Sequence, residues 1–138
     1  MRVESLLVLA VIAAGTPTPN AARSVPSGPW GGRGIALTVE DSGAKIEMDC
    51  AHGRIIGRLV LDADGRFELP GTFTRERPGP VHMGPNGEAQ EEKGEPARYS
   101  GRVEGDALRV SIRLESGGRE MGPFELQAGT TPRLHKCL

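Results

Sequence analysis

The chain has 138 residues, enough for one domain with a modest hydrophobic core. Its 17 basic and 18 acidic residues give a net charge of −1, and its aromatic residues are one tryptophan, one tyrosine and three phenylalanines. A nearly neutral chain with so few stacking rings is not typical of proteins that bind nucleic acid or anionic membranes. We therefore expect neither as a partner. The 20 glycines and 11 prolines predict many turns and little helix.

The N-terminal residues have the features of a secretory signal peptide. Arg2 precedes an apolar run from Leu6 to Ala14, and small residues suited to cleavage end that run. The run is too short to span a bilayer as a helix, so we expect no stable membrane insertion. We predict a secreted or periplasmic protein with a signal peptide at residues 1–15, a flexible linker at residues 16–29 and one domain at residues 30–138.

The chain has two cysteines, Cys50 and Cys137, an even number in a chain expected to be exported. A disulfide between them would close a loop of nearly ninety residues. In the chain-entropy model, such a loop stabilises the fold by roughly 4 to 5 kcal/mol. The alternative is a pair of unpaired buried thiols, which an oxidising compartment disfavours. The sequence therefore predicts a disulfide.

Apolar and polar residues alternate on both sides of several tight turns, which predicts an antiparallel meander. A three-residue loop at 63–65, ending in glycine, would pair Leu59 with Leu69 and Ile55 with Phe73. All four side chains would then share one face of the sheet, because side chains alternate along a strand.

Two-residue turns are predicted before this hairpin, at Ser42-Gly43 and at His52-Gly53. The first would place Leu37 opposite Met48, and the second would place Met48 opposite Gly57. The first strand is expected at residues 34–41. All of these turns, each positioned independently, collect apolar residues on the same face of the sheet.

After residues 78–96, which are rich in Gly, Pro and Glu and predicted to form a long solvated loop, the meander resumes. A turn at Gly105-Asp106 would place Tyr99 opposite Ile112. The next hairpin would place Leu114 opposite Met121, and a one-residue bulge at Gly122-Pro123 would keep the later apolar residues inside. The last strand is predicted at residues 132–138.

Eight antiparallel strands with one apolar face must shield that face from water, and closure into a barrel also removes the exposed edges. We therefore predict an all-β fold, an eight-stranded up-and-down barrel, with a β-sandwich as the alternative. Closure would place Cys137 at the same mouth of the barrel as Cys50. A chain end that crosses this mouth would allow the two sulfurs to meet.

The tripeptide Gly28-Pro29-Trp30, just ahead of the first predicted strand, resembles the Gly-x-Trp of lipocalin-like, calycin-type barrels. The resemblance implies that Trp30 packs across the closed end beneath a basic residue of the last strand, either Arg133 or Lys136. It also implies a small ligand inside the barrel. The chain is similar as well to small exported bacterial barrel proteins of unknown role, through Trp-Gly-Gly, Asp49 to Gly53 and a terminal Cys-Leu.

No catalytic or metal-binding motif stands out. Asp62 to Gly65 matches only part of a calcium-binding loop, and a hairpin turn accounts for all four residues. A disulfide would bring the chain near His52 and His135 together, but their strands are predicted to run parallel, which sends the two side chains apart, and His82 lies on the predicted loop. No serine has the Gly-x-Ser-x-Gly context. We therefore predict no catalytic residues, no metal and no cofactor.

One pattern on the outer face suggests a binding site. The turn at Gly105-Asp106 places Arg102 opposite Arg109 and Arg98 opposite Arg113. Directly opposed like charges destabilise a sheet unless something neutralises them. Glu125 on the next strand is one candidate; a bound anion or an acidic partner is the other, since arginine pairs well with carboxylate and phosphate.

These features predict an exported, non-enzymatic binding module. It would carry a small apolar ligand if Gly57, Gly71 and Gly101 leave room beside the inner wall, although the same glycines would also let the sheet bend. The alternative is a protein-binding or protease-inhibitor-type barrel that acts through the loop at residues 78–96. The ligand or partner is not identified by the sequence.

Overall fold

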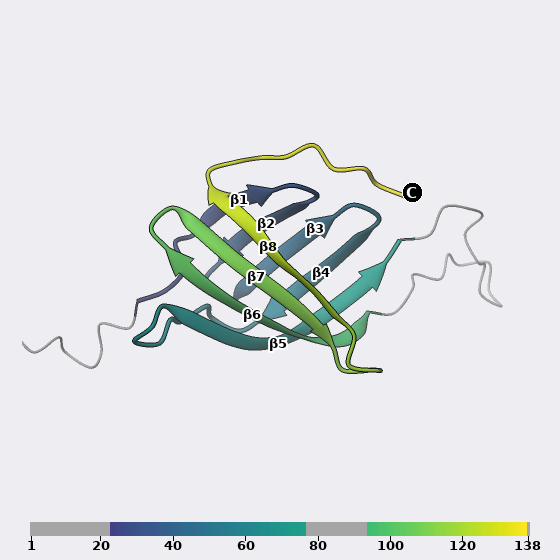
Figure 1. The fold of residues 1–138 in the computed structure, drawn as a ribbon, viewed down its shortest axis with the longest axis horizontal. Helices are drawn as coiled ribbons and strands as arrows, with labels where there is room; N and C mark the ends of the chain where they lie inside the picture. Colours follow the sequence, from purple (N-terminus) through teal and green to yellow (C-terminus); the bar gives the residue numbers. More distant parts are fainter. Residues whose placement is uncertain (1–22, 77–93, 138) are drawn as a thin grey trace, which may run out of the picture.

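The computed structural model describes residues 23–76 and 94–137. They form a closed barrel in which each strand pairs with the next antiparallel strand and the last strand pairs with the first (Figure 1). The predicted up-and-down barrel is thus confirmed, and the sandwich alternative was wrong. The strands are β1 (Gly28–Gly32), β2 (Ile35–Glu40), β3 (Gly43–Met48), β4 (Ala51–Ile56), β5 (Arg66–Arg75), β6 (Glu95–Glu104), β7 (Ala107–Leu114) and β8 (Glu120–Ala128). No helix long and apolar enough to cross a membrane occurs in these described ranges.

The predicted sorting of side chains between the two faces is confirmed. Ile35, Leu37 and Val39 of β2 are buried, whereas the residues between them are more exposed. Leu59 and Tyr99 are also buried. Apart from the exposed Ile56, the large apolar side chains of the described strands therefore lie inside the barrel or against its core, and the charged residues lie outside or at its mouths.

The predicted pairing between strands was wrong in the first half of the chain, by two residues at the first turn and by six at the second. Leu37 pairs with Ile46 instead of Met48, and Met48 pairs with Ala51 instead of Gly57. The turn after β3 is Asp49-Cys50, three residues earlier than the predicted turn at His52-Gly53. Cys50 adopts the left-handed backbone that such turns need, with a φ of 55°. Because the error is even, the faces are still sorted correctly.

The hairpin around residues 63–65 is also shifted. Ile55 pairs with Gly71 instead of Phe73, and β4 already ends at Ile56. Gly57 follows with a φ of 111°, a conformation that turns the chain out of the strand. Residues 57–65 therefore form an irregular connection, although Leu59 within it still reaches the core.

The domain begins earlier than predicted. Residues 28 and 29, assigned above to the linker, belong to β1, which the sequence analysis did not recognise as a strand. Upstream, Val25 is buried, and its N–H donates to the carbonyl of Leu59 at 2.9 Å. Because glycine occupies position 31, β1 lacks the alternation of apolar and polar side chains by which the other strands were predicted. A Cβ at this position would collide with the carbonyl oxygen of Thr130, so packing selects glycine where an alternating pattern would show a side chain.

The end of the chain differs as well. The last strand is β8, and residues 129–137 cross the mouth of the barrel instead of forming a strand (Figure 1). Within β8 the pairing shifts between Met121 and Phe124, which confirms the predicted bulge at Gly122-Pro123. Met121 pairs with Ile112, however, and not with Leu114.

Two of our predicted segments lie largely outside the described residues. Of the predicted loop at 78–96, Glu95 and Pro96 begin β6, which corrects its boundary, and residues 78–93 are not described. The predicted signal peptide at 1–15 also lies outside the described part of the chain.

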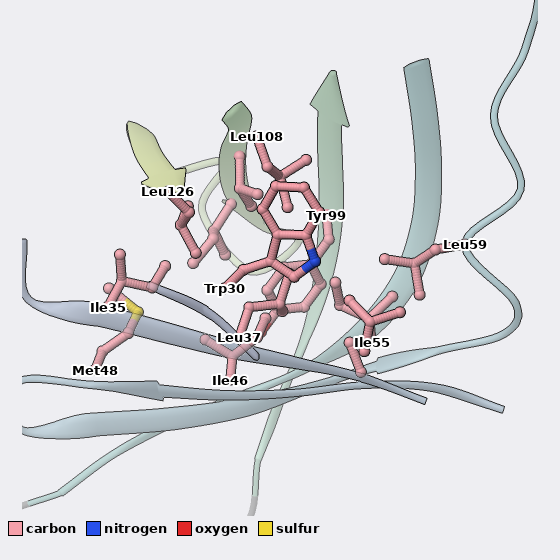
Figure 2. Close-up of a cluster of buried hydrophobic side chains, with 14 of the residues drawn as sticks. Trp30, Ile35, Leu37, Ile46, Met48, Ile55, Leu59, Tyr99, Leu108 and Leu126 are labelled. Carbon is pink, nitrogen blue, oxygen red and sulfur yellow. The ribbon is translucent and has the colours of Figure 1, made fainter. Parts of the chain in front are cut away.

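Aromatic rings occupy the space that the inner glycines provide. Figure 2 shows Trp30 in the middle of the buried cluster, and its indole N–H donates to the carbonyl of Pro26 at 3.0 Å. A Cβ at Gly71 would lie 2.7 Å from the Tyr99 ring, and one at Gly101 would lie 2.5 Å from the Phe67 ring. At these positions the glycines make room for the protein's own side chains.

Candidate functional site

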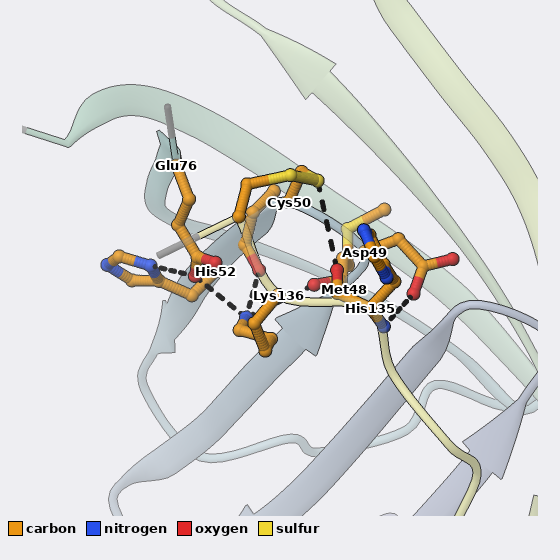
Figure 3. Close-up of a disulfide and its surroundings, with 9 residues drawn as sticks. Met48, Asp49, Cys50, His52, Glu76, His135 and Lys136 are labelled. Carbon is orange, nitrogen blue, oxygen red and sulfur yellow. Dashed lines mark hydrogen bonds and ion pairs between the residues drawn. A yellow bond between two sulfur atoms is a disulfide. The ribbon is translucent and has the colours of Figure 1, made fainter. Parts of the chain in front are cut away.

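Charged side chains cluster in two regions of the described surface, and the first is the mouth crossed by the C-terminal segment. The predicted disulfide is confirmed: Cys50, in the turn between β3 and β4, is bonded to Cys137, with the two Cα atoms 4.7 Å apart (Figure 3). The N–H of Cys50 donates to the carbonyl of His135 at 2.9 Å, and the N–H of His135 donates to Asp49 Oδ1 at 2.7 Å. The segment is therefore fixed to this turn by one covalent bond and two hydrogen bonds.

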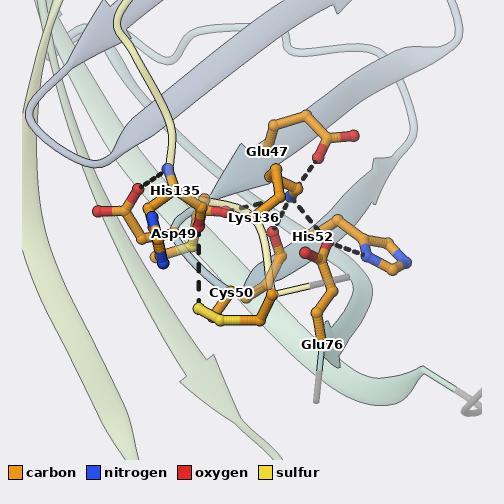
Figure 4. Close-up of polar contacts among 10 residues, drawn as sticks. Glu47, Asp49, Cys50, His52, Glu76, His135 and Lys136 are labelled. Atoms are coloured by element: carbon orange, nitrogen blue, oxygen red, sulfur yellow. Dashed lines mark hydrogen bonds and ion pairs between the residues drawn. A yellow bond between two sulfur atoms is a disulfide. The ribbon is translucent and has the colours of Figure 1, made fainter. Parts of the chain in front are cut away.

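Lys136 fastens the same segment beside the disulfide. Its Nζ lies 2.7 Å from Glu47 Oε2 and 2.7 Å from Glu76 Oε2, and it also lies 3.1 Å from the carbonyl of Met48 and 3.0 Å from that of Ala51 (Figure 4). Only 27% of the side chain is exposed. An ammonium group has three protons, so these four acceptors satisfy it fully. Lys136 is therefore not the basic residue that the lipocalin resemblance placed over the tryptophan. Arg133, the other candidate, is exposed.

Glu76 is the most buried charge of this mouth, with 7% of its side chain exposed. Its Oε2 accepts from Lys136 and lies 2.9 Å from His52 Nδ1, whereas Oε1 has no hydrogen-bond partner among the described residues. Burial favours the neutral acid, but the hydrogen bonds and positive charges of Lys136 and His52 outweigh it, so the pKa of Glu76 lies below its ordinary value. Burial likewise opposes the charge of Lys136, but Glu47 and Glu76 raise its pKa.

Glu47, His52, Glu76 and Lys136 form what we call the mouth cluster. Its contacts hold the C-terminal segment against the barrel and leave no ready ligand site among the described residues. All three ammonium protons of Lys136 have acceptors, and no group of three or more His, Cys, Asp or Glu in the described ranges is arranged to hold a metal ion. His52 faces Glu76 and the N–H of His135 faces Asp49, while His82 lies outside the described residues. The chemistry of the mouth cluster is that of a structural fastening.

The second region is the outer face of β5, β6 and β7. The predicted pairs are present: Arg98 lies opposite Arg113, and Arg102 lies opposite Arg109. The structure adds Arg66, which lies opposite Arg102 on its other side. We call these five residues the arginine face. Three of them, Arg66, Arg102 and Arg109, form a continuous row across three neighbouring strands, which are about 4.8 Å apart in a sheet.

Nearby carboxylates neutralise only part of the positive charge of the arginine face. Arg109 Nη2 lies 2.8 Å from Glu125 Oε1, so the predicted neighbour is present. Arg102 reaches Glu104 at 3.4 Å, and Arg98 reaches Glu68 at 3.5 Å. All of these side chains are largely exposed, and such ion pairs are weak. For Arg66 and Arg113, the described residues supply no paired carboxylate.

A groove lies over the same three strands. Its volume is about 770 Å³, and one wall is formed by the connection at residues 60–62, where Val60 is 42% exposed. A smaller hollow of about 200 Å³ shares Arg102 and Arg109 with it. The groove is lined by Val60, Leu61, Asp62, Arg66, Phe67, Glu68, Ser100, Gly101, Arg102, Arg109 and Ser111.

The sequence revealed four of the five arginines but neither Arg66 nor the groove. The four lie on one hairpin, whose turn fixes their pairing. Arg66 is opposed to Arg102 across β5 and β6, which are joined by residues 76–94, and a connection of that length contains no turn from which a pairing can be counted. The wall at Val60 depends on the irregular connection, which the sequence analysis treated as strand.

No protein-family model, curated protein or solved structure matches this chain. Function is therefore inferred from the barrel and its surface.

Proposed function

We propose that the protein is an exported, non-enzymatic binding module that binds an acidic ligand on its arginine face. The observation that carries this proposal is the row formed by Arg66, Arg102 and Arg109 on the floor of a groove of about 770 Å³. Like charges directly opposed on neighbouring strands cost stability. A bound carboxylate, phosphate or sulfate would neutralise them and accept paired hydrogen bonds from guanidinium groups.

The packing of the interior favours this outer site over the carrier predicted from the sequence. The rings of Tyr99 and Phe67 lie against Gly71 and Gly101, where a ligand was expected to fit. The Tyr99 hydroxyl donates to the carbonyl of Thr72 at 2.6 Å, and burial raises its pKa. A ligand inside the barrel would have to displace these packed side chains.

Export is the second part of the proposal. A disulfide is typical of proteins in an oxidising, extracytoplasmic compartment, and the one between Cys50 and Cys137 fastens the end of this domain. Together with the signal-like residues 1–15, it supports secretion or a periplasmic location.

The test measures binding of polyglutamate, a flexible polyanion, to the wild type and to the double variant Arg102→Glu/Arg109→Glu. We expect an affinity loss of about tenfold or more, because two direct charge contacts become repulsive. The matched control is Lys45→Glu/Arg54→Glu, which reverses another directly opposed basic pair, on β3 and β4, with the same change in net charge.

The control variant is expected to bind within about threefold of the wild type, since it alters only the distant field. Equal losses in both variants would mean that polyglutamate responds to net charge alone. Unchanged binding in the arginine variant would also refute the proposed site. Far-ultraviolet circular dichroism and thermal unfolding verify that each variant is folded.

A further inference from the structure

We infer that the acidic ligand is an extended protein segment that adds a short strand to the exposed edge of β5 at Glu68. The inference rests on the proposed function, because it names the ligand of the arginine face. β4 is shorter than its neighbour β5, and the pairing of the two strands begins at Ile55 and Gly71. The first half of β5, residues 66–70, therefore pairs only with β6.

In this half of β5, each residue directs its backbone N–H and carbonyl either toward β6 or away from it. The carbonyl of Arg66 accepts from the N–H of Asp62 at 2.9 Å, and the N–H of Arg66 donates to Asp62 Oδ1 at 2.9 Å. Arg66 therefore directs both groups away from β6. In an antiparallel pair this direction alternates, and the pairing with β6 is regular through Glu68, so Glu68 also directs its N–H and carbonyl away from β6.

Within the described residues, Glu68 has no backbone hydrogen bond to the neighbouring connection, and the N–H groups of Gly57, Val60 and Leu61 donate to other carbonyls. Two positions further along the same edge is Pro70, which has no N–H to donate, as is usual where a strand borders no other strand. Glu68 and Pro70 are exposed. The edge thus offers the N–H donor and the carbonyl acceptor of Glu68, enough to hold a short strand.

The surroundings of this edge define the segment's chemistry. Outside the barrel, Arg66 and Arg102 lie next to it and favour acidic side chains. Beneath it, Leu61 and Leu69 are partly buried against the core, and Val60 forms an exposed apolar wall. A strand presents alternate side chains to opposite faces. A segment that alternates acidic and apolar residues would satisfy both faces.

A polysaccharide with acidic groups would use the arginine row but neither the edge of Glu68 nor the apolar wall. Addition of a strand to a sheet edge uses both, since backbone hydrogen bonds supply affinity and side-chain pockets supply selectivity. Charge and backbone together therefore favour a protein segment as the occupant.

The experiment titrates the full domain with the peptide Ac-(Glu-Val)3-NH2. Two derivatives are compared with it, one N-methylated on the glutamates and one on the valines, so that each removes a different alternate set of N–H donors. Only one set can face β5, so we expect one derivative to lose about tenfold or more in affinity and the other to bind almost like the parent. The Glu68 amide should become protected from hydrogen exchange when the parent peptide binds.

Equal binding of both derivatives, or an unprotected Glu68 amide in the saturated complex, would overturn the inference. The proposed function would survive that result if Arg102→Glu/Arg109→Glu still lost polyglutamate binding. A dimer that forms through the same edge without peptide would also overturn the inference, because the occupant would then be a second copy of this chain. Loss of peptide binding in the arginine variant, with Lys45→Glu/Arg54→Glu unaffected, would link edge and charge in one site.

Discussion

The mouth cluster and the arginine face both bring basic side chains close to carboxylates, yet they do so in opposite ways. At the mouth, Lys136 is largely shielded from water and has four acceptors within 3.1 Å. On the face, Arg102 is 48% exposed, has one carboxylate at 3.4 Å and lies between two other arginines. At the mouth the fold itself supplies every acceptor that the ammonium group needs, whereas the face leaves donors and positive charge available to a ligand.

The difference shows that the burial of an ion pair decides how much the fold depends on it. A buried charge must be fully paired, because an unpaired one costs several kcal/mol. An exposed charge is solvated by water, so the fold tolerates a row of like charges at a small cost. Stability should therefore depend on the mouth cluster, and binding should depend on the arginine face.

The largest effect is expected from the disulfide. Cys50→Ser should lower the free energy of unfolding by roughly 4 to 5 kcal/mol, because the unfolded chain regains the freedom of a long loop. Urea unfolding of the variant and of the wild type measures this. As a control, a dithiol reductant should bring the wild type close to the variant and leave the variant unchanged. A loss below about 1 kcal/mol would show that the fastening contributes little to the fold.

A smaller effect is expected from Glu76→Gln, which removes the charge that faces Lys136 and His52. We expect a loss of about 2 kcal/mol at neutral pH, since hydrogen bonds to charged groups are worth about that much. Because folding lowers the pKa of Glu76, this stabilisation is present above its ordinary value of 4.5 and is lost as the pH falls through the folded value.

The difference in unfolding free energy between wild type and Glu76→Gln should therefore narrow below a pH of about 4.5. The control on the arginine face is Glu68→Gln, whose side chain is 62% exposed and which should cost less than about 0.5 kcal/mol. Equal losses in the two variants would contradict the contrast between the regions. Thermal or urea unfolding across a series of pH values supplies both measurements.

The smallest effect is expected from Arg102→Glu. A carboxylate between Arg66 and Arg109 replaces repulsion by attraction, so unfolding should become harder by about 0.5 kcal/mol. High salt should weaken the gain, because the charges are exposed. Urea unfolding at low and high ionic strength measures it. A clear destabilisation would assign Arg102 a structural role and remove the cost on which the proposed function depends.

The alternation of apolar and polar residues predicted correctly which side chains lie inside the barrel. The positions of the turns, which decide the pairing between strands, were predicted less well. The pairing of Arg102 with Arg109 was predicted correctly because Gly105-Asp106 leaves one plausible turn. The two earlier turns had alternatives one and three residues away, which shift the pairing by two and by six residues and sort the faces equally well. Pairs such as Leu37 with Ile46 were therefore missed, although both residues were correctly placed inside.

Contacts between segments far apart in the sequence could not be predicted, for a different reason. The cluster of Lys136 with Glu47 and Glu76 requires residues 129–137 to leave the sheet and cross the mouth, whereas the pattern suggested a last strand. The disulfide was predictable because only one pairing of two cysteines exists. The groove depends on the irregular connection after Ile56, which alternation cannot describe.

The disulfide has a further consequence for how the chain survives damage. Because it joins Cys50 to Cys137, β4 to β8 belong to one covalent ring. A single cut by a protease at any peptide bond between these cysteines opens the ring but releases no fragment. The protein would thus remain one molecule after such a cut, and its two pieces would separate only on reduction.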